Sequence, residues 1–508
     1  MSKKRFAINV VMNWAAMVTG MVVPFFLAPF VVRHLGATIY GIWILAVSTV
    51  AYLNMLDLGL RGAIVRFVSK SSAEGNNEDA QKAIGATLWF RFLIAFCVAL
   101  ISVTLAFFFP HIFKIPQDQQ HAAQITVLLC ALGVAISLLS GVYSGVLAAI
   151  NRFDLLSLII VLQTLGRAIG VIVILRNGGG LIALAWWEFV IVLLASFALL
   201  FAALKMYPPC RILVLRPDMA TLKSIWSYSF KSFIILIAVQ VVFYTDNIVV
   251  GAFLSVGVVT FYSIAGSLAI YSGQISTSMG STFIPMASRF DASGEANSLQ
   301  RLLLRGTQAM LGLMLPIGVT LLLRGKTFIG LWMGSQFSEV SGTILQILMI
   351  SQFFTIANST AGQIAYGVDK HKSVANCAAI EAVFNLSLSL VLVKTIGLYG
   401  VSWGTSISMA IVHLVFWPRF VKKEYGVSVQ TYLWEGWGKI LACSIPFGFA
   451  TALVDRHFHP GSLITFFGQV ILTLPVYFLV VLAIFHKPVF STFKRWQASR
   501  RPAVPGLV

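Results

Sequence analysis

The stretch Leu56–Asn76, LDLGLRGAIVRFVSKSSAEGN, decides how the rest of the chain is interpreted. An apolar segment that begins near Tyr40 ends in it, and the arginines Arg61 and Arg66 follow. A polar turn comes next, and a new apolar segment starts near Ala83. This order is typical of a membrane helix that reaches the cytoplasmic surface, turns and re-enters, because Lys and Arg gather beside the cytoplasmic ends of membrane spans.

The same order returns in the second half of the chain. Pro285–Gly306, PMASRFDASGEANSLQRLLLRG, also follows an apolar segment, and its Arg289-Phe290 pair corresponds to Arg66-Phe67. The duplication predicts two copies of one six-helix unit. Because six is an even number, the copies insert with the same orientation, around a pseudo-two-fold axis along the membrane normal.

Composition places the chain in a membrane. Charged residues make up 10% of the 508 residues, against roughly 25% in soluble domains, and hydrophobic residues make up 58%. The net charge of +19 is compatible with nucleic-acid binding, but the basic residues lie in short loops, which membrane topology explains better, so no nucleic-acid partner is expected. The five cysteines are scattered without a CxxC pair, which indicates neither a disulfide framework nor a metal site.

A membrane helix needs about 20 mostly apolar residues, and this length divides the chain into fourteen predicted spans. The sequence therefore predicts an all-α polytopic membrane protein. The apolar run after MSKKR continues to Val32 and is interpreted as a first span, not as a cleaved signal peptide. The predicted spans are Ile8–Val32, Tyr40–Leu60, Ala83–Phe109, Ala122–Ile150, Leu155–Leu175, Leu181–Leu204, Ser232–Leu254, Val258–Phe283, Gly306–Leu323, Ser341–Tyr366, Ser373–Val393, Leu398–Trp417, Trp437–Val454 and Leu463–Phe485.

These spans divide the chain into five parts. Residues 1–204 form an N-terminal lobe with six helices, and residues 232–420 form a C-terminal lobe with six more. Residues 205–231 join them through a cytoplasmic linker whose apolar positions recur every three or four residues, as in an amphipathic interfacial helix. Residues 421–486 hold two extra helices, and residues 487–508 form a basic cytoplasmic tail.

The distribution of basic residues orients the chain. Most of the 36 Lys and Arg residues lie at the N-terminus, in the even-numbered loops and in the C-terminal tail, so both termini are predicted to be cytoplasmic. The longest predicted loop on the outer side, Arg324–Val340, is too short to fold as a domain. The odd-numbered loops hold Arg33, Lys114, Arg176, Arg324, Lys326, Lys394 and Arg456.

Ionisable side chains at membrane depth are expensive to bury and usually face a partner or a cavity. Arg167 and Glu188 lie at similar depth on consecutive spans, so they are expected to form an ion pair, either as a structural link between helices or as part of a cavity wall. Asp246 is the best candidate for a protonatable or cation-binding site, with a hydrogen-bonded structural Asp as the alternative. Arg91 and Glu381 are further candidates within predicted spans.

Near the predicted cytoplasmic mouth, Asp57 and Arg61 are four residues apart and can pair on one helix face. Arg61, Arg66 and Arg289 are either topological charges or receptors for a phosphorylated head group, because guanidinium binds phosphate oxygens bidentately. Asn13 shares the first span with Pro24 and Pro29, which make that span a candidate bending element or a simply kinked lipid-facing helix.

Two stretches resemble a known family. LGATIYGIWILAVSTVAYLNMLDLGLRGAIVRFVSKSSAEGN, from Leu35, and TDNIVVGAFLSVGVVTFYSIA, from Thr245, resemble bacterial polysaccharide-transport proteins, the O-antigen or repeat-unit flippases. Their superfamily also contains multidrug and toxin extruders and the lipid II flippase. The resemblance implies two lobes around a cationic cavity in the bacterial cytoplasmic membrane, alternating access, and an oligosaccharide on undecaprenyl diphosphate as substrate. In the lipid II flippase the first helix contributes arginines, but residues 8–32 of this chain contain none.

The expected function is therefore translocation of a lipid-linked oligosaccharide from the inner to the outer leaflet, with no enzymatic step and no cofactor except a possible coupling H⁺ or Na⁺. Arg61, Arg66, Arg91 and Arg289 would attract the diphosphate, and Arg167 and Asp246 would line the deeper path. Polysaccharide polymerase and chain-length regulator proteins are the partners that the resemblance implies. The alternatives are a cation-coupled drug antiporter of the same superfamily and a membrane glycosyltransferase or polymerase, which would need a catalytic loop that the chain lacks.

Overall fold

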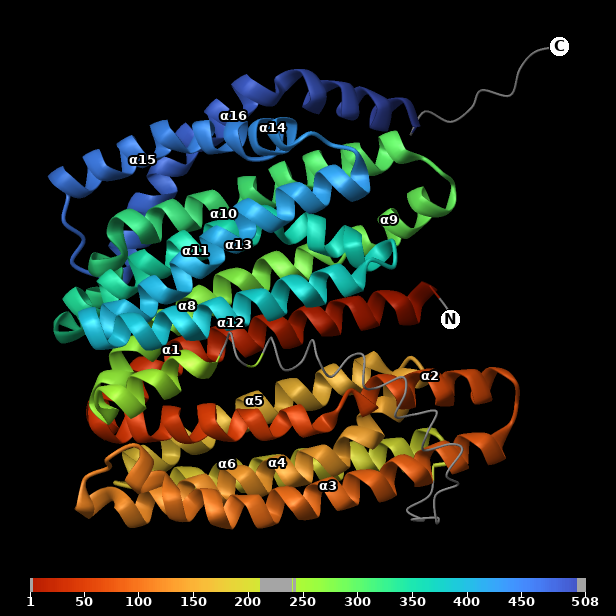
Figure 1. Ribbon diagram of the computed structural model, residues 1–508, viewed down its shortest axis with the longest axis vertical. Helices are drawn as coiled ribbons and strands as arrows, with labels where there is room; N and C mark the ends of the chain where they lie inside the picture. Colours follow the sequence, from red (N-terminus) through yellow and green to blue (C-terminus); the bar gives the residue numbers. More distant parts are fainter. Residues whose placement is uncertain (1–2, 211–239, 241–243, 500–508) are drawn as a thin grey trace. The chain divides into compact units, whose positions relative to one another are not determined.

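The computed structural model describes residues 3–210, 240 and 244–499. This part of the chain is helical, with helix content of 91% and no strands. Twelve of its helical segments are long and apolar enough to cross a membrane. Its long helices are α1 Lys3–Ala51, α3 Asn77–Ile112, α4 Gln120–Ala149, α5 Phe153–Arg176, α6 Leu181–Met206, α8 Val256–Gly280, α10 Ala296–Met333, α11 Ser335–Gly367, α12 His371–Ile396, α13 Leu398–Tyr425, α15 Lys439–His457 and α16 Leu463–Ser499 (Figure 1).

Short helices join several of these. The 3₁₀ helices are η1 Tyr52–Asp57 and η2 Gln117–Gln119, the short α-helices are α2 Leu60–Ala73, α9 Phe283–Ala292 and α14 Val429–Thr431, and η3 Tyr432–Gly438 is a π-helix. The predicted amphipathic linker lies mostly within residues 211–239, outside the described residues, and the first part of the predicted seventh span, except residue 240, lies outside them as far as residue 243.

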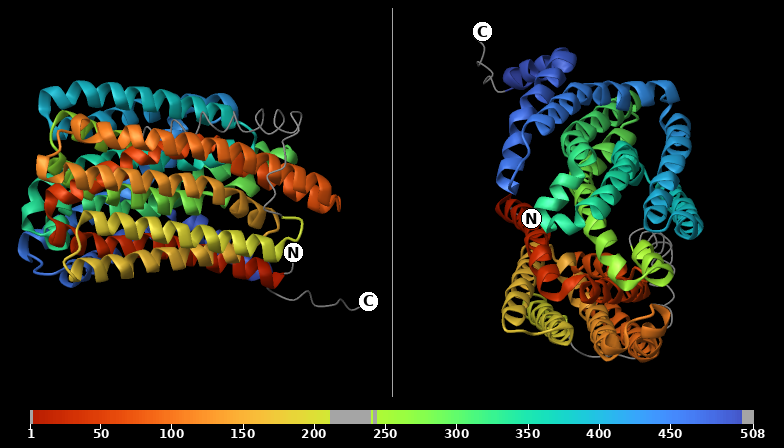
Figure 2. Two further views of the ribbon diagram at one scale, coloured as in Figure 1. Left: turned by 90° about the horizontal axis from the view of Figure 1, so that it is seen from below. Right: turned by 90° about the vertical axis from the view of Figure 1, so that its left-hand side faces the viewer.

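The described helices fall into two compact units. Unit 1 consists of residues 1–264 and 375–405, and unit 2 consists of residues 265–374 and 406–508. In unit 1, α4 packs against both α3 and α6, and α1 packs against α5 (Figure 2). In unit 2, α10 packs against α11 and α15, and α15 packs against α16. The predicted lobe boundaries stay predictions.

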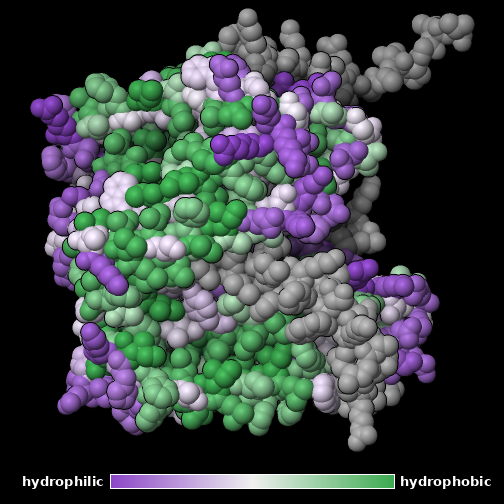
Figure 3. Space-filling view, viewed as in Figure 1, coloured by the Kyte–Doolittle hydropathy of each residue, from purple (hydrophilic) through white to green (hydrophobic). Residues whose placement is uncertain are grey.

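The surface of the helices matches a lipid environment. In the view of Figure 3, hydrophobic side chains cover the middle of the visible helices, and hydrophilic side chains gather toward the helix ends. Large apolar side chains such as Phe96, Ile169 and Phe201 are more than half exposed. A soluble protein does not leave so many apolar side chains in water, so this surface is the one that faces lipid.

Two backbone breaks interrupt the first predicted spans. Gly36, with φ 76° and ψ 168°, bends α1 between the first and second predicted spans. The second span was predicted to continue to Leu60, but α1 ends at Ala51, η1 follows, and Leu58 and Gly59 adopt left-handed conformations before α2 begins. The polar turn predicted after α2 is present: Asn76 accepts a hydrogen bond from the Asp79 amide and caps α3.

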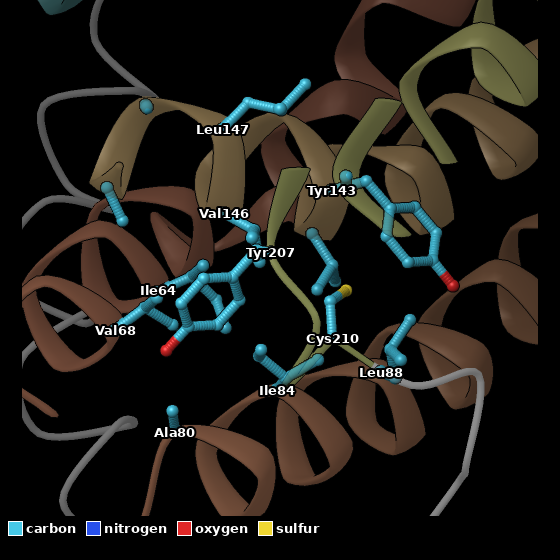
Figure 4. Close-up of a cluster of buried hydrophobic side chains, with 14 of the residues drawn as sticks. Ile64, Val68, Ala80, Ile84, Leu88, Tyr143, Val146, Leu147, Tyr207 and Cys210 are labelled. Atoms are coloured by element: carbon cyan, nitrogen blue, oxygen red, sulfur yellow. The ribbon is translucent and has the colours of Figure 1, made fainter. Parts of the chain in front are cut away.

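The end of α2 is anchored in a buried apolar cluster of unit 1. Ile64 and Val68 of α2 meet Ile84 of α3, and Tyr207 and Cys210 approach from the segment after α6 (Figure 4). Burial raises the pKa of the Cys210 thiol to about 11. This thiol is therefore un-ionised at neutral pH and acts as a small packing residue.

The predicted outer segment Arg324–Val340 is largely helical. Helix α10 continues to Met333, and α11 begins at Ser335 after the single residue Gly334. Arg324, with φ −117° and ψ 20°, is a non-helical residue that kinks α10 directly after the predicted ninth span. The Arg324 side chain is 1% exposed; its Nε donates to Asp455 Oδ1 at 2.7 Å, and its Cζ lies 4.6 Å from the centre of the Phe466 ring. A charge that looks like a loop signal therefore has partners inside unit 2.

Candidate functional site

Four of the predicted ionisable residues of unit 1 form two ion pairs with different surroundings. The first joins Arg91 of α3 to Asp57 at the end of η1, and the same guanidinium donates to the Leu138 carbonyl of α4. Arg91 is 1% exposed. Gly141 makes this burial possible, because any side chain there would overlap the guanidinium. This pair therefore holds η1, α3 and α4 together.

The predicted pairing of Asp57 with Arg61 is replaced by this contact. The left-handed residues Leu58 and Gly59 separate the two side chains, so they do not share a helix face. Arg61 is exposed on α2 instead. Asp57 neutralises the charge of Arg91, and the arginine side chain is buried, so Arg91 is poorly suited to bind a diphosphate.

The second ion pair confirms the predicted contact between Arg167 of α5 and Glu188 of α6. It is bidentate: Arg167 Nε donates to Glu188 Oε2 and Nη2 donates to Oε1, both at 2.6 Å. The Arg167 side chain is 40% exposed and that of Glu188 is 20% exposed. Both side chains line a pocket of about 170 Å³ between α1, α5 and α6, so the pair belongs to a cavity wall.

Three aromatic side chains share the remaining wall of this pocket with aliphatic side chains of the same helices. Tyr40 and Trp43 come from α1, and Trp187 comes from α6. The Trp187 indole donates a hydrogen bond of 3.2 Å to the Gly166 carbonyl. A side chain at Gly170 would overlap the indole ring, so the absence of a side chain at Gly170 leaves the room in which Trp187 lies.

Asp246 lies in the helical segment 244–253 and is 5% exposed. Its Oδ2 accepts hydrogen bonds from Tyr262 of α8 at 2.5 Å and from Thr405 of α13 at 2.7 Å. Thr405 in turn accepts one from Asn385 Nδ2 of α12 at 2.9 Å. Among the described residues, Asp246 Oδ1 and Asn385 Oδ1 have no hydrogen-bond partner. Two buried acceptor oxygens thus remain where a donor or a cation can bind.

The remaining predicted site residues are placed separately. Arg66 of α2 and Arg289 of α9 are exposed, Asn13 of α1 is exposed, and Glu381 of α12 is half-buried. Arg289 lies in unit 2, whereas the other predicted site residues lie in unit 1. The two short helices α2 and α9 are each followed by a glycine with positive φ, 69° at Gly75 and 67° at Gly294, as the sequence repeat predicts for equivalent turns.

Sequence reasoning missed the neutral members of both sites. Tyr262, Asn385 and Thr405 lie around Asp246, but apart from Asn13 the uncharged polar residues of the apolar spans are not among the predicted candidates. Trp43 and Trp187 are also absent from the predicted site residues. The one available signal was spacing: Gly166 and Gly170 stand one helical turn apart beside Arg167, which is typical of a helix that a bulky neighbour approaches closely.

The fold is that of membrane transporters built from long, bent helices around polar interior sites. A solved structure of the lipid II flippase MurJ in an inward closed conformation superposes with a TM-score of 0.74 at 15% identity, over 95% of this chain and 100% of that one. An inward-facing multidrug transporter of the MATE family superposes with a TM-score of 0.66 at 14% identity, over 82% of this chain and 98% of that one.

Sequence comparison assigns the chain to one family of membrane proteins. The family model described as polysaccharide biosynthesis protein matches residues 6–291, and the chain belongs to this family. The membrane protein EpsK of Bacillus subtilis, whose function is uncharacterised, is 23% identical over 84% of this chain and 85% of its own length. A Shigella flexneri protein described as an O-antigen transporter is 22% identical over 74% of this chain and 88% of its own. The relatives with a stated function are named as transporters or flippases.

Proposed function

We propose that the protein is a flippase that moves an oligosaccharide repeat unit, linked to undecaprenyl diphosphate, from the inner to the outer leaflet of the bacterial cytoplasmic membrane. It does so with fourteen membrane helices, both termini in the cytoplasm, and alternating access of two six-helix lobes. The family match over residues 6–291 carries this proposal. Polysaccharide polymerase and chain-length regulator proteins would act on the translocated product.

The charges support an anionic lipid-linked substrate. Arg61 and Arg66 are exposed on α2, and Arg289 is exposed on α9, the equivalent element of the repeat. Guanidinium groups bind diphosphate oxygens bidentately. Moving negative charge outward across an inside-negative membrane is favourable by about 2.3 kcal/mol per charge per 100 mV. The membrane potential therefore contributes to the driving force without an ATP-binding motif.

The oxygen cluster around Asp246 supports coupling to H⁺ or Na⁺. If a proton binds, the protonated carboxyl of Asp246 becomes a hydrogen-bond donor where only acceptor oxygens are present now. If Na⁺ binds, the carboxylate oxygens of Asp246 and Asn385 Oδ1 would coordinate it. Either ion neutralises a carboxylate that is otherwise expensive at membrane depth. Coupling requires that the ion bind more tightly to one of the two access states than to the other, so that its binding shifts the equilibrium between them.

Reconstitution tests the transport activity. Proteoliposomes that contain the protein and a radiolabelled undecaprenyl-diphosphate oligosaccharide are treated with an impermeant glycosidase, and the protected fraction of the lipid is measured over time. The proposal predicts that wild-type protein exposes the protected pool, faster with the membrane potential imposed in the favourable direction. Equal protection in liposomes with and without the protein would contradict it.

The coupling site is tested in the same vesicles. Asp246→Asn should abolish the dependence of the rate on the H⁺ or Na⁺ gradient, because the amide carries no negative charge for either ion to neutralise. Asp118→Asn removes an exposed acidic residue of the same unit and should leave that dependence unchanged. A gradient dependence that survives in Asp246→Asn would end the coupling hypothesis.

The drug antiporter remains a second candidate, because multidrug transporters share the fold. It predicts that cells expressing the protein export ethidium against a gradient and that Asp246→Asn removes this export. The flippase proposal predicts no ethidium export above the empty-vector control.

A further inference from the structure

We propose that the pocket between α1, α5 and α6 is a subsite for a single sugar ring of the transported glycan. The inference rests on the proposed function and adds a place where the glycan, as distinct from its diphosphate, is held. Within unit 1, the pocket combines flat aromatic walls with a bidentate ion pair that is still accessible. A pyranose ring presents apolar C–H faces and a rim of hydroxyl groups. The aromatic walls are complementary to the C–H faces, and the ion pair is complementary to the hydroxyl groups.

The volume indicates one ring. The pocket holds about 170 Å³, which is below the roughly 300–1,000 Å³ of sites for drug-sized ligands. It therefore accommodates a part of a larger substrate, and the rest of the glycan would extend out of it. The C–H face of a pyranose packs against an indole as other apolar surfaces do, and Trp43 and Trp187 supply such rings from two helices.

The ion pair supplies the polar part of the site. Arg167 uses Nε and Nη2 for Glu188; a guanidinium has five N–H donors and a carboxylate has about four acceptor positions, so both partners keep capacity for hydroxyl groups. Because the two charges neutralise each other, the pair favours a neutral hydroxylated ligand over a phosphate. A lipid acyl chain is disfavoured, since it would cover accessible charged groups without giving them hydrogen bonds.

The aromatic wall is held in place before any ligand binds. Trp187 is fixed by its hydrogen bond to the Gly166 carbonyl and by its fit against Gly170. Val31, Leu175 and Leu184 form a buried cluster against which Trp43 packs, and Val31 and Leu184 are themselves part of the pocket wall. Such preorganisation lowers the conformational entropy that binding must overcome, which suits recognition of a small group with few contacts.

The test uses neighbouring tryptophans as a matched pair. Trp187 lines the pocket, whereas the adjacent Trp186 does not line it and is 52% exposed. The full-length protein, in nanodiscs without glycoside detergents, is titrated with methyl glycosides of glucose, galactose, mannose and N-acetylglucosamine, and saturation transfer to the ring protons is measured by NMR. At least one glycoside should bind wild type, with affinity in the millimolar range that a few contacts give. Trp187→Leu should weaken that binding by about tenfold, and Trp186→Leu should not change it.

The outcomes separate this inference from the proposed function. Equal binding to wild type and Trp187→Leu, or binding lost equally in Trp186→Leu, would overturn the subsite, as would saturation transfer to lipid chains but to none of the glycosides. If Trp187→Leu elutes as misfolded protein, Glu188→Gln replaces it and should also weaken binding. Failure of lipid-linked glycan transport by wild type, with glycoside binding still sensitive to Trp187, would overturn the flippase proposal and leave the subsite intact.

Discussion

Two of the arginine–carboxylate pairs in unit 1, Arg91–Asp57 and Arg167–Glu188, have similar chemistry and different surroundings. Arg91 is 1% exposed and also binds the Leu138 carbonyl, whereas Arg167 is 40% exposed and borders a pocket. A glycine fits each arrangement: Gly141 leaves room for the Arg91 guanidinium, and Gly170 leaves room for the indole beside Arg167. The comparison teaches that an ion pair at membrane depth indicates a site only where its surroundings leave part of it accessible to a ligand.

The largest effect is expected from breaking the buried pair. Arg91→Ala leaves Asp57 without its cation and the Leu138 carbonyl without its donor, and removal of one member of a buried pair costs about 3–5 kcal/mol. We expect loss of most folded protein, measured as the monodisperse fraction after extraction and size-exclusion chromatography. The double variant Arg91→Leu/Asp57→Leu should recover much of that fraction because it leaves no unpaired charge. A monodisperse Arg91→Ala variant with wild-type thermal stability would contradict the structural role.

The sequence predicted one of the two ion pairs and not the other, because only the first depends on features that can be read from neighbouring helices. Arg167 and Glu188 lie on consecutive helices at matching depth, so helix geometry alone predicts their contact. Asp57 and Arg91 are brought together by the left-handed turn at Leu58 and Gly59, whose geometry the hydrophobic pattern does not encode. Pattern reasoning therefore assigned Asp57 to the partner that an unbroken helix would have given it.

The helical conformation of the predicted outer loop was missed for a similar reason: it depends on contacts with residues that are distant in the sequence. Average hydropathy treats Arg324 as a break, but its pairing with Asp455 and its stacking on Phe466 offset the cost of burying it. Those partners lie more than a hundred residues later in the chain, so no local window reveals them. Apolar length predicts most of the helices, whereas the contacts between them depend on tertiary partners. The neutral neighbours of Asp246 were missed for the same reason.

An intermediate effect on stability is expected at Gly170, the glycine that leaves room for the Trp187 indole. Gly170→Ala places a methyl group where the Trp187 indole lies, and the rigid ring must move to avoid it. We expect moderate destabilisation of about 1–3 kcal/mol, typical of overpacking, and loss of the methyl glycoside response. Gly166→Ala, one turn away, meets only the end of the Ile191 side chain at 3.1 Å and should keep both properties. Unchanged glycoside binding in Gly170→Ala would show that Trp187 does not form the wall.

The smallest stability effect should come from neutralising the accessible pair. Arg167→Gln/Glu188→Gln removes both charges together and keeps two side chains that hydrogen-bond to each other. For an accessible pair the expected change in the free energy of unfolding is within about 1 kcal/mol, measured by thermal unfolding in nanodiscs. Glycoside binding should nevertheless fall, because an amide pair offers fewer donors and weaker acceptors to hydroxyl groups than the guanidinium and carboxylate. A double variant as unstable as Arg91→Ala would make Arg167–Glu188 a second structural link, and the difference between the two pairs would disappear.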